Sequence, residues 1–395
     1  MKIAGIICEY NPFHNGHLYQ IEQTKKTGAT HIIAVMSGNF VQRGDVSIAP
    51  KAAKVQAAID SGADLVLELP TVWSLSSAEN FAKGAISVLK STGVTDFLSF
   101  GCECDDINVL TDIAERINEK EVDTKLKQYL DEGISYAAAR AKAINEVISP
   151  EAERIISQPN NILACEYLNA LKGSNIKPVA IKRNTTHDAK SDDAFNKSAS
   201  EIREMIFAGN PAFKKAMPIS SYEVLRQYAK IGQCPVGIDS LNTEMMAVLR
   251  RMEADDFKSF ADVSEGLENR LYNAVKQSTS VNEILLRAKS KRYTMARLRR
   301  ILICAYLGIG KGYANMEVPY IRVLGMNEKG KEILKEMREK CEKPIIMKYA
   351  DINSAGAMAR KIFDYECMAA DLYSLAFKKP LPCGTEMTYN IYIKE

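Results

Sequence analysis

The chain has no apolar run approaching the ~18 residues that a membrane-spanning helix needs, so it is not expected to cross a membrane. Its first residues already form an apolar strand pattern, and no secretory signal peptide is expected. The nine cysteines are scattered, and Cys102-x-Cys104 has no second pair at a metal-binding spacing. Neither a zinc site nor a disulfide framework is therefore expected, and the thiols are expected to be reduced in a cytoplasm.

The chain also lacks a strong charge of either sign. It has 52 Lys and Arg against 49 Asp and Glu, a net charge of +3, so any nucleic-acid surface must be a local patch. It shows no internal repeats and no low-complexity segments. A length of 395 residues exceeds one typical core and indicates two or three domains.

The most informative segment is residues 9–18, EYNPFHNGHL, which directly follows the apolar run at residues 3–8. That run is typical of a buried strand in a parallel sheet. Pro12 and Gly16 interrupt the pattern, and helical spacing resumes at Leu18. The segment is therefore expected where a strand gives way to the N-terminus of a helix.

His14 and His17 lie three positions apart at this transition, so both can reach one ligand. Free N–H groups and the helix dipole favour a phosphate there, and Gly16 leaves room for it beside the backbone. Two simpler interpretations are that the histidines only cap the helix or that they bind zinc. No HExxH spacing or Cys/His cluster supports zinc, and the strand–turn–helix context favours a nucleotide.

Alternating strand and helix patterns follow over the first hundred residues. Further strands are predicted at residues 31–36, 63–69 and 97–100, and helices at residues 49–61 and 77–91. This alternation predicts an α/β fold with a doubly wound parallel sheet, in which ligands bind at the carboxyl ends of the strands. The HNGH loop, Ser37-Gly38-Asn39, Pro70 and Gly101 all fall at such ends and are expected to share one site.

The loop at residues 37–45 is rich in hydrogen-bonding groups and has a glycine near each end. Gln42 and Arg43 could bind phosphate or an acyl substrate, and Lys51 lies one helical turn further on. An ordinary solvated loop is the alternative.

Two later helix starts are further candidates. Pro159 imposes an extended entry, after which Asn160 or Asn161 can cap the next helix. In the segment 197–203, KSASEIR, we expect Ser200 as the N-cap and Arg203 in the first turn. A guanidinium in the first turn is unfavourable, because it has the same sign as the positive end of the helix dipole. An anion bound between the guanidinium and the helix N-terminus would remove this conflict.

A strongly basic segment lies at residues 287–300, where seven of fourteen residues are Lys or Arg and none is acidic. The helix expected from Thr294 would direct Arg297 and Arg300 away from its apolar face, and Tyr293 could stack on a base. The segment is the best nucleic-acid candidate in the chain. An ordinary solvated helix face is the alternative.

These patterns predict three regions. Residues 1–215 form the α/β domain, residues 216–312 form a helical region that includes the basic segment, and residues 313–395 form a small mixed α/β appendage. Arg183 is expected at the polar end of a further strand of the first region.

Several of these motifs occur in a family-specific order. GIICEYNPFHNGH, MSGNFVQRG, DLVLELP, FGCE, PNNIL, SASEIR, EGLENRL and KRYTMARLRR follow one another along nearly the whole chain. Together they resemble the bacterial tRNA(Met) cytidine acetate ligases, and HxGH resembles the HIGH motif of the wider nucleotidyltransferase superfamily. The resemblance implies that residues 1–215 activate acetate with ATP as acetyl-adenylate, releasing pyrophosphate.

The acetyl group would then pass to N4 of the wobble cytidine of elongator tRNA(Met), giving N4-acetylcytidine and AMP without acetyl-CoA. The resemblance implies that His14 and His17 are catalytic and stabilise charge on the α-phosphate. Mg²⁺ is expected with ATP, no dedicated metal site is expected, and no protein partner is predicted.

The resemblance also implies residue assignments. The expected ATP-binding residues are Ile7, Cys8, Glu9, Tyr10, Asn11, Pro12, Phe13, His14, Asn15, Gly16, His17, Leu18, Tyr19, Gln20, Gly101, Asn160 or Asn161, Arg183, Ser198, Ser200 and Arg203. The expected acetate pocket lies near Tyr10, Gly38 and Asn39. The expected tRNA-binding residues are Lys289, Lys291, Arg292, Arg297, Arg299 and Arg300.

Two other functions compete with this one. A small-molecule adenylyltransferase of the pantetheine or nicotinate type is usually far shorter, and the ~180 residues after the motif core would then be superfluous. A non-catalytic RNA-binding protein could use a degenerate nucleotidyltransferase scaffold, but intact HNGH and SASEIR elements argue against it.

Overall fold

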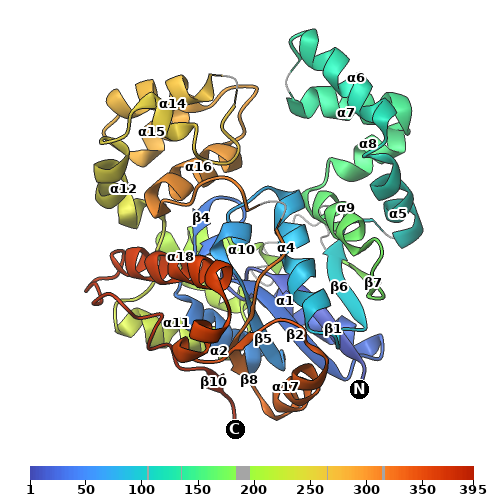
Figure 1. Cartoon of the computed structure of the whole chain (residues 1–395), viewed down its shortest axis with the longest axis vertical. Helices are drawn as coiled ribbons and strands as arrows, with labels where there is room; N and C mark the ends of the chain where they lie inside the picture. Colours follow the sequence, from blue (N-terminus) through green and yellow to red (C-terminus); the bar gives the residue numbers. More distant parts are fainter. Residues whose placement is uncertain (105, 135, 184–195, 265, 314–315) are drawn as a thin grey trace.

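The computed structural model describes all residues except 105, 135, 184–195, 265 and 314–315 (Figure 1). A mostly parallel sheet with the strand order β10-β8-β5-β2-β1-β6-β7 forms its centre. Among the described residues, no helix is long and apolar enough to span a membrane.

The five parallel strands predicted from the sequence form the main part of this sheet. β1 (Ile3–Cys8) lies between β2 (His31–Ser37) and β6 (Phe97–Cys102), and the outer neighbours are β5 (Leu65–Leu69) and β7 (Lys177–Lys182). The predicted α/β class with a doubly wound sheet is confirmed. Because the strands are parallel, the carboxyl ends of all five meet at one edge.

The end of the chain completes this sheet. β8 (Ile321–Met326) pairs antiparallel with β5, and both β9 (Ile345–Ile346) and β10 (Tyr392–Ile393) pair parallel with β8. Residues 313–395, expected as a small mixed α/β appendage, therefore contribute strands to the central sheet itself. Strand pairing between distant segments decides this point, and no local pattern encodes it.

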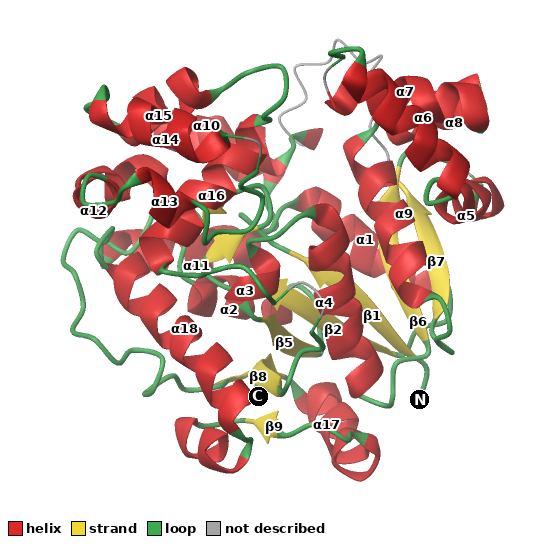
Figure 2. Ribbon diagram, turned by 45° about the horizontal axis from the view of Figure 1, so that its top comes forward, coloured by secondary structure: helices red, strands yellow, loops and turns green. Residues whose placement is uncertain are grey.

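Alternate residues of the strands feed two cores, as the period of two requires. Ala4 and Ile6 of β1 pack on the face covered by α1 (Asn15–Lys26) and α2 (Lys51–Asp60), in a core with Ile21 and Val55. Residues of the opposite parity face α4 (Ala78–Ser91) and α17 (Glu328–Lys340), which cover the other face (Figure 2).

A helical excursion separates β6 from β7 in the chain. Figure 1 shows α6 and α7 projecting well beyond the sheet, whereas α9 packs beside α4. Its helices are α5 (Ile107–Arg116), α6 (Lys120–Asp131), α7 (Tyr136–Val147), α8 (Pro150–Ile156) and α9 (Pro159–Leu171).

Between β7 and β8, the regular elements of the described residues are all helical. α11 packs on α2, and α12 to α16 form a group of their own around buried Leu249, Leu271, Ile284 and Leu298 (Figure 1). The elements are α10 (Ala199–Phe207), η2 (Pro211–Ala216), α11 (Ile219–Lys230), η3 (Ile238–Leu241), α12 (Asn242–Leu249), α13 (Ala254–Phe257), α14 (Leu267–Lys276), α15 (Val281–Ala288) and α16 (Met295–Leu307).

Four short elements and one long helix remain. The loop predicted at residues 37–45 contains a hairpin of β3 (Phe40–Val41) and β4 (Asp45–Val46), and α3 (Thr71–Ser74) follows β5. Near the end of the chain, η4 (Tyr349–Ser354) precedes α18 (Ala357–Ser374), which packs on α3 and α16.

Candidate functional site

The two histidines of HNGH build the N-terminus of α1. His14 is the N-cap, its Nδ1 accepts from the Gly16 N–H (3.0 Å), and His17 Nδ1 accepts from the His14 N–H (3.2 Å). The ring centroids are 3.8 Å apart. The histidines therefore do cap the helix, and because each Nδ1 accepts, the hydrogen-bond network assigns the proton of each neutral ring to Nε2.

The surroundings keep both rings neutral. Burial and then the nearby Arg183 charge lower the pKa of His14 to about 3, and burial, His14 and Arg183 lower the pKa of His17 well below its usual value. Each ring is thus a neutral Nε2–H donor at pH 7. Such donors can stabilise negative charge that develops on a phosphate without giving up a proton.

Gly16 is required by this cap. A Cβ at residue 16 would lie only 2.8 Å from Cε1 of His14, so a side chain there would displace the ring. The predicted reason for the glycine was room for a polyphosphate beside the backbone. The structure adds a second reason, which is the packing of the histidine ring over the turn.

The turn between β1 and α1 is held from several sides. Tyr10 has a φ of 45°, in the left-handed region that disfavours non-glycine residues, and its ring lies 4.9 Å from that of His17. Asn11 Oδ1 accepts from the Ile48 N–H (2.7 Å), and Arg203 donates to the Asn11 carbonyl (2.8 Å). The loop is therefore clamped by elements far from it in sequence.

The residues at the end of β1 hold neighbouring strands. Ile7 packs against the core, and the Cys8 thiol donates to the Val35 carbonyl (3.7 Å). The Glu9 carboxylate accepts from the Gln42 N–H (2.7 Å). These contacts connect β1 to β2 and to the β3–β4 hairpin.

The predicted residues on α1 are equally engaged. Asn15 donates to the Lys215 carbonyl (2.9 Å), Gln20 donates to a carbonyl of β6 (3.3 Å), and Leu18 packs on the apolar core. Tyr19 is half-buried. Much of the stretch predicted to bind ATP therefore builds the loop, and its chemistry lies in the histidine rings and the helix N-terminus.

Arg183 and Asn160 join the histidines at this edge of the sheet. Arg183 follows β7, and its Nη1 donates to Asn160 Oδ1 (3.4 Å). A Cβ at Gly101 would lie 3.4 Å from the Arg183 side chain, so the glycine lets the arginine cross β6. The structure therefore brings together Gly101, Asn160, Arg183 and the two histidines.

Asn160 and Asn161 differ in their roles. Neither is the N-cap of α9, as was predicted for one of them, because Gln158 occupies that position. Asn161 is buried, its Oδ1 accepts from the N–H groups of Glu103 (2.9 Å) and Cys104 (3.2 Å), and its Nδ2 donates to a carbonyl of α8 (2.9 Å). Asn160 is half-buried and contacts Arg183 and Glu103. Asn160 is therefore the one placed to reach a ligand.

This difference predicts the outcome of two alanine substitutions. Asn161→Ala should lower the free energy of unfolding by about 1–3 kcal/mol, because two buried N–H groups lose their acceptor. Asn160→Ala should weaken ATP binding about tenfold or less, with an unchanged midpoint of thermal unfolding. Calorimetric titration with ATP and thermal melts of both variants separate the two roles, and the opposite pattern would reverse the assignment.

The SASEIR segment forms a helix start two residues earlier than predicted. Ser198 is the N-cap of α10 and forms a capping box with Glu201, so Ser200 lies inside the helix and Arg203 lies beyond its first turn. Arg203 donates to Ser200 Oγ (3.3 Å) and lies 3.7 Å from the Asp45 carboxylate. It still reaches the β1–α1 loop, through the carbonyl of Asn11.

Gln42, Arg43 and Lys51, the candidates for binding phosphate or an acyl substrate, have different surroundings in the structure. The Gln42 side chain donates to the Ser76 carbonyl (3.3 Å), and Arg43 is exposed at the hairpin turn. Lys51 is buried and ion-paired with Glu68 and Glu386, both at 2.6 Å. Lys51 therefore neutralises buried carboxylates.

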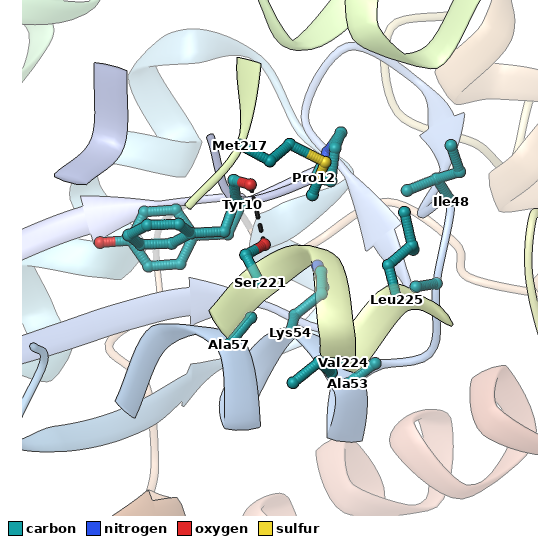
Figure 3. Close-up of a pocket in the computed structure, with 12 residues that line it drawn as sticks. Tyr10, Pro12, Ile48, Ala53, Lys54, Ala57, Met217, Ser221, Val224 and Leu225 are labelled. Atoms are coloured by element: carbon teal, nitrogen blue, oxygen red, sulfur yellow. Dashed lines mark hydrogen bonds between the residues drawn. The ribbon is translucent and has the colours of Figure 1, made fainter. Parts of the chain in front are cut away.

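The predicted acetate residues do not share one cavity. A small, mostly apolar cavity lies behind the β1–α1 loop, between α2 and α11, and Tyr10 is one of its walls (Figure 3). Gly38 lies beside the Glu68 carboxylate, and Asn39 Oδ1 accepts from the Lys51 N–H (2.8 Å). The cavity is lined by Tyr10, Pro12, Phe13, Ile48, Ala49, Ala53, Lys54, Ala57, Met217, Ser221, Val224 and Leu225.

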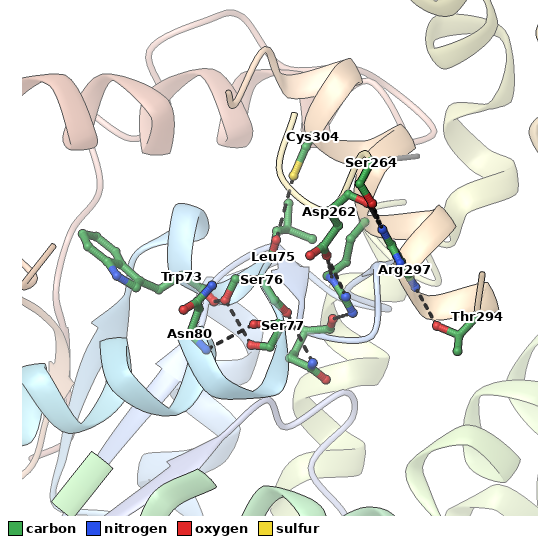
Figure 4. Close-up of polar contacts among 12 residues, drawn as sticks. Trp73, Leu75, Ser76, Ser77, Asn80, Asp262, Ser264, Thr294, Arg297 and Cys304 are labelled. Carbon is green, nitrogen blue, oxygen red and sulfur yellow. Dashed lines mark hydrogen bonds and ion pairs between the residues drawn. The ribbon is translucent and has the colours of Figure 1, made fainter. Parts of the chain in front are cut away.

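The basic helix α16 is less exposed than predicted. Arg300 is ion-paired with Asp262 (2.9 Å) and its side chain is only 11% exposed, while Arg297 donates to the Asp262 carbonyl (2.8 Å) and to Ser264 Oγ (3.0 Å) (Figure 4). Tyr293 is buried under the Arg297 guanidinium. Arg297 and Arg300, expected to point away from the apolar face of the helix, are thus held by Asp262. The expectation that the Tyr293 ring is available for a base to stack on is wrong, because the ring is buried.

The exposed part of the basic segment precedes α16. Lys289, Lys291 and Arg292 are exposed, whereas Arg299 is half-buried. The turn between β3 and β4 packs closely against α16 at Arg299. Gly44 allows this packing, since a Cβ at residue 44 would lie 2.7 Å from the Cβ of Arg299. The positive surface is thus centred on residues 289–292.

Sequence reasoning missed two acidic partners of the predicted residues. Glu103, in the FGCE motif, accepts from the Asn161 N–H (3.1 Å) and from the Asn160 side chain, so it places a carboxylate at the N-terminus of α9. Asp262 holds Arg297 and Arg300 of α16. FGCE was a visible signal for Glu103, but nothing near residue 300 indicates Asp262.

Comparisons with known proteins identify the family of this chain. A family model described as HIGH Nucleotidyl Transferase matches residues 1–386. A protein of Thermoanaerobacter sp. (strain X514) named tRNA(Met) cytidine acetate ligase is 43% identical, with 98% of this chain and 99% of the relative covered. One of Acetivibrio thermocellus with the same name is 38% identical over all of both chains.

Solved structures are similar over the whole length. The crystal structure of Thermotoga maritima TmcAL has a TM-score of 0.93 and 31% identity, covering 100% of this chain and 99% of that one. TmcAL bound with alpha-thio ATP has a TM-score of 0.92 and 30% identity, with the same coverage. The chain therefore belongs to the tRNA(Met) cytidine acetate ligase family of HIGH nucleotidyl transferases.

Proposed function

We propose that this protein activates acetate with ATP and transfers the acetyl group to N4 of the wobble cytidine of elongator tRNA(Met), forming N4-acetylcytidine. The observation that carries the proposal is the pair of neutral histidines at the N-terminus of α1, each with its proton at Nε2. Full-length relatives that carry the ligase name support the choice of substrates.

In the first step, a carboxylate oxygen of acetate attacks the α-phosphorus of ATP, the bond to the β-phosphate oxygen breaks, and pyrophosphate leaves. Negative charge builds on the α-phosphate oxygens, where the Nε2–H groups of His14 and His17 would donate. The positive charge of Arg183, beside both rings, would add to this stabilisation. In the second step, the cytidine N4 attacks the acetyl carbonyl and AMP leaves.

The remaining assignments follow from the same geometry. We assign Gly101, Asn160, Arg183, Ser198, Ser200 and Arg203 to the ATP site. Among the described residues, no group of three or more His, Cys, Asp and Glu side chains could hold a metal, so Mg²⁺ would be bound by the ATP phosphates. Tyr10, Gly38 and Asn39, which follow the ends of β1 and β2, stay the proposed acetate contacts. The tRNA substrate places the protein in the cytoplasm.

The test is ATP–pyrophosphate exchange with the purified protein, with acetate compared against other small carboxylates, and with and without bulk tRNA. Acetate-dependent exchange, followed by labelled acetate appearing in tRNA, supports the proposal. Exchange that needs no carboxylate, or no exchange in either condition, would reject it in favour of another nucleotidyl acceptor or an RNA-binding role.

We also propose that tRNA contacts the exposed basic residues 289–292 before α16. Lys289→Glu/Lys291→Glu should lower tRNA affinity at least about tenfold and flatten its dependence on salt, because fewer counterions are released on binding. Acetate-dependent exchange without tRNA should be unchanged. Filter binding at several salt concentrations provides the measurement.

The matched control reverses two exposed lysines on α17, Lys331→Glu/Lys335→Glu, far from α16 in Figure 1. Both double variants change the net charge equally, so a purely global electrostatic effect would weaken tRNA binding in both. Equal loss of affinity in the two variants would remove residues 289–292 from the tRNA surface.

A further inference from the structure

Lys54 is a buried lysine of α2 that the ATP-site assignment does not use. Its side-chain ammonium donates to the main-chain carbonyls of Glu9 (2.9 Å), Ser37 (2.8 Å) and Gly38 (2.6 Å). An ammonium has three N–H donors, so each one has its own acceptor. The three carbonyls belong to the last residue of β2 or to the first residue beyond β1 and β2.

The charge of Lys54 is not explained by an ion pair. Lys51, one turn earlier on α2, is also buried but contacts two carboxylates. Within the described part of the chain, Lys54 makes no ion pair, and burial lowers its pKa to about 8. The nearby Glu9 charge offsets the cost of burying the ammonium only in part, and a methionine of similar length would avoid that cost. The role of the buried ammonium is therefore to hold the three carbonyls to which it donates.

Those carbonyls determine the path of the loop that carries the histidines. Glu9 immediately precedes Tyr10, whose left-handed backbone places its ring against that of His17. Lys54 reaches from α2 toward this loop, below Tyr10 and Pro12 (Figure 3). Fixing the Glu9 carbonyl thus fixes the turn at Tyr10, and through it the orientation of His17.

We propose that Lys54 is a positioning residue for the nucleotide site, where its ammonium ties the ends of β1 and β2 together and holds the turn that orients His14 and His17. The inference rests on the proposed role of these histidines at the α-phosphate. It assigns Lys54 no contact with ATP, acetate or tRNA.

The test compares Lys54→Met with Lys90→Met in acetate-dependent ATP–pyrophosphate exchange at saturating substrates. Lys90 also donates to a main-chain carbonyl, that of Ala170 (3.0 Å), but it is exposed at the end of α4. We expect Lys54→Met to lose at least about tenfold in kcat, because a small misplacement of catalytic groups is expensive, and Lys90→Met to keep the wild-type rate. Thermal melts show whether each variant is folded.

The pH dependence of the exchange rate distinguishes a positioning role from a merely structural one. A lysine that only stabilised the fold would not change this pH dependence. As pH rises through about 8, Lys54 becomes an amine with two N–H donors for three carbonyls, so the wild-type rate should fall between about pH 7 and 9.5, while Lys54→Met should show no such fall. Cys8, Glu9, Lys51 and Glu68 face Lys54. Over this range the raised pKa of the Cys8 thiol, the raised pKa of Lys51 and the lowered pKa of Glu68 keep their charges constant.

The outcomes separate this inference from the proposed function. No exchange in the wild-type protein rejects the proposed function itself. Wild-type exchange together with full kcat in folded Lys54→Met overturns only the role of Lys54. If Lys54→Met does not fold, the pH dependence of the wild-type exchange rate tests the inference instead. A wild-type rate that stays constant through pH 8 overturns it.

Discussion

His17→Ala and His14→Ala should each lower acetate-dependent ATP–pyrophosphate exchange by about 100- to 1,000-fold, the usual loss when one preorganised donor to a developing oxyanion is removed. Each ring is a neutral Nε2–H donor, because its Nδ1 is occupied by a main-chain N–H and its pKa is lowered by burial and by Arg183. The loss should appear mainly in kcat, since the charge that the donors stabilise develops in the transition state.

His31→Gln is the matched control, because His31 is another buried histidine of the chain. It lies at the amino end of β2, opposite the proposed site, and its Nε2 contacts the Glu332 carboxylate (3.0 Å). We expect this variant to keep its exchange rate per folded molecule. Full turnover in both His14→Ala and His17→Ala would falsify the proposed chemistry.

Lys51→Met should have the largest effect on stability, a loss of about 3–5 kcal/mol in the free energy of unfolding. Lys51 and Arg322 lie between Glu68 and Glu386 in a fully buried cluster that joins α2, β5, β8 and the end of the chain. Burial lowers the pKa of Lys51, but the attraction of Glu386 and Glu68 outweighs this and raises it overall. Removing the ammonium leaves the buried carboxylates with too little positive charge.

Urea unfolding of Lys51→Met and Lys331→Met provides the measurement. Lys331 makes an ion pair of the same length (2.6 Å) with Glu328, but its side chain is 47% exposed, so its loss should cost under about 1 kcal/mol. A cost for Lys51→Met as small as that for Lys331→Met would show that Arg322 alone neutralises the cluster.

Several features of this protein were predictable because neighbouring residues encode them. Apolar runs located the five parallel strands, and Pro12 and Gly16 located the start of the helix that carries the histidines. The carboxyl ends of parallel strands share one edge, so a common site could be inferred before any coordinates. The N-cap Ser198 also has a local signal, since Ser-x-x-Glu at 198–201 matches a capping box, which Ser200 does not form.

The tertiary structure alone decided the partners of the charged groups. Arg300 pairs with Asp262, Lys54 holds carbonyls of two strands, and β8 pairs with β5 across most of the chain. Such contacts join residues far apart in sequence, and their free energy comes from burial and geometry that no local window contains. The chemistry of the site was therefore readable from HNGH, whereas the orientation of its side chains follows from packing between distant segments.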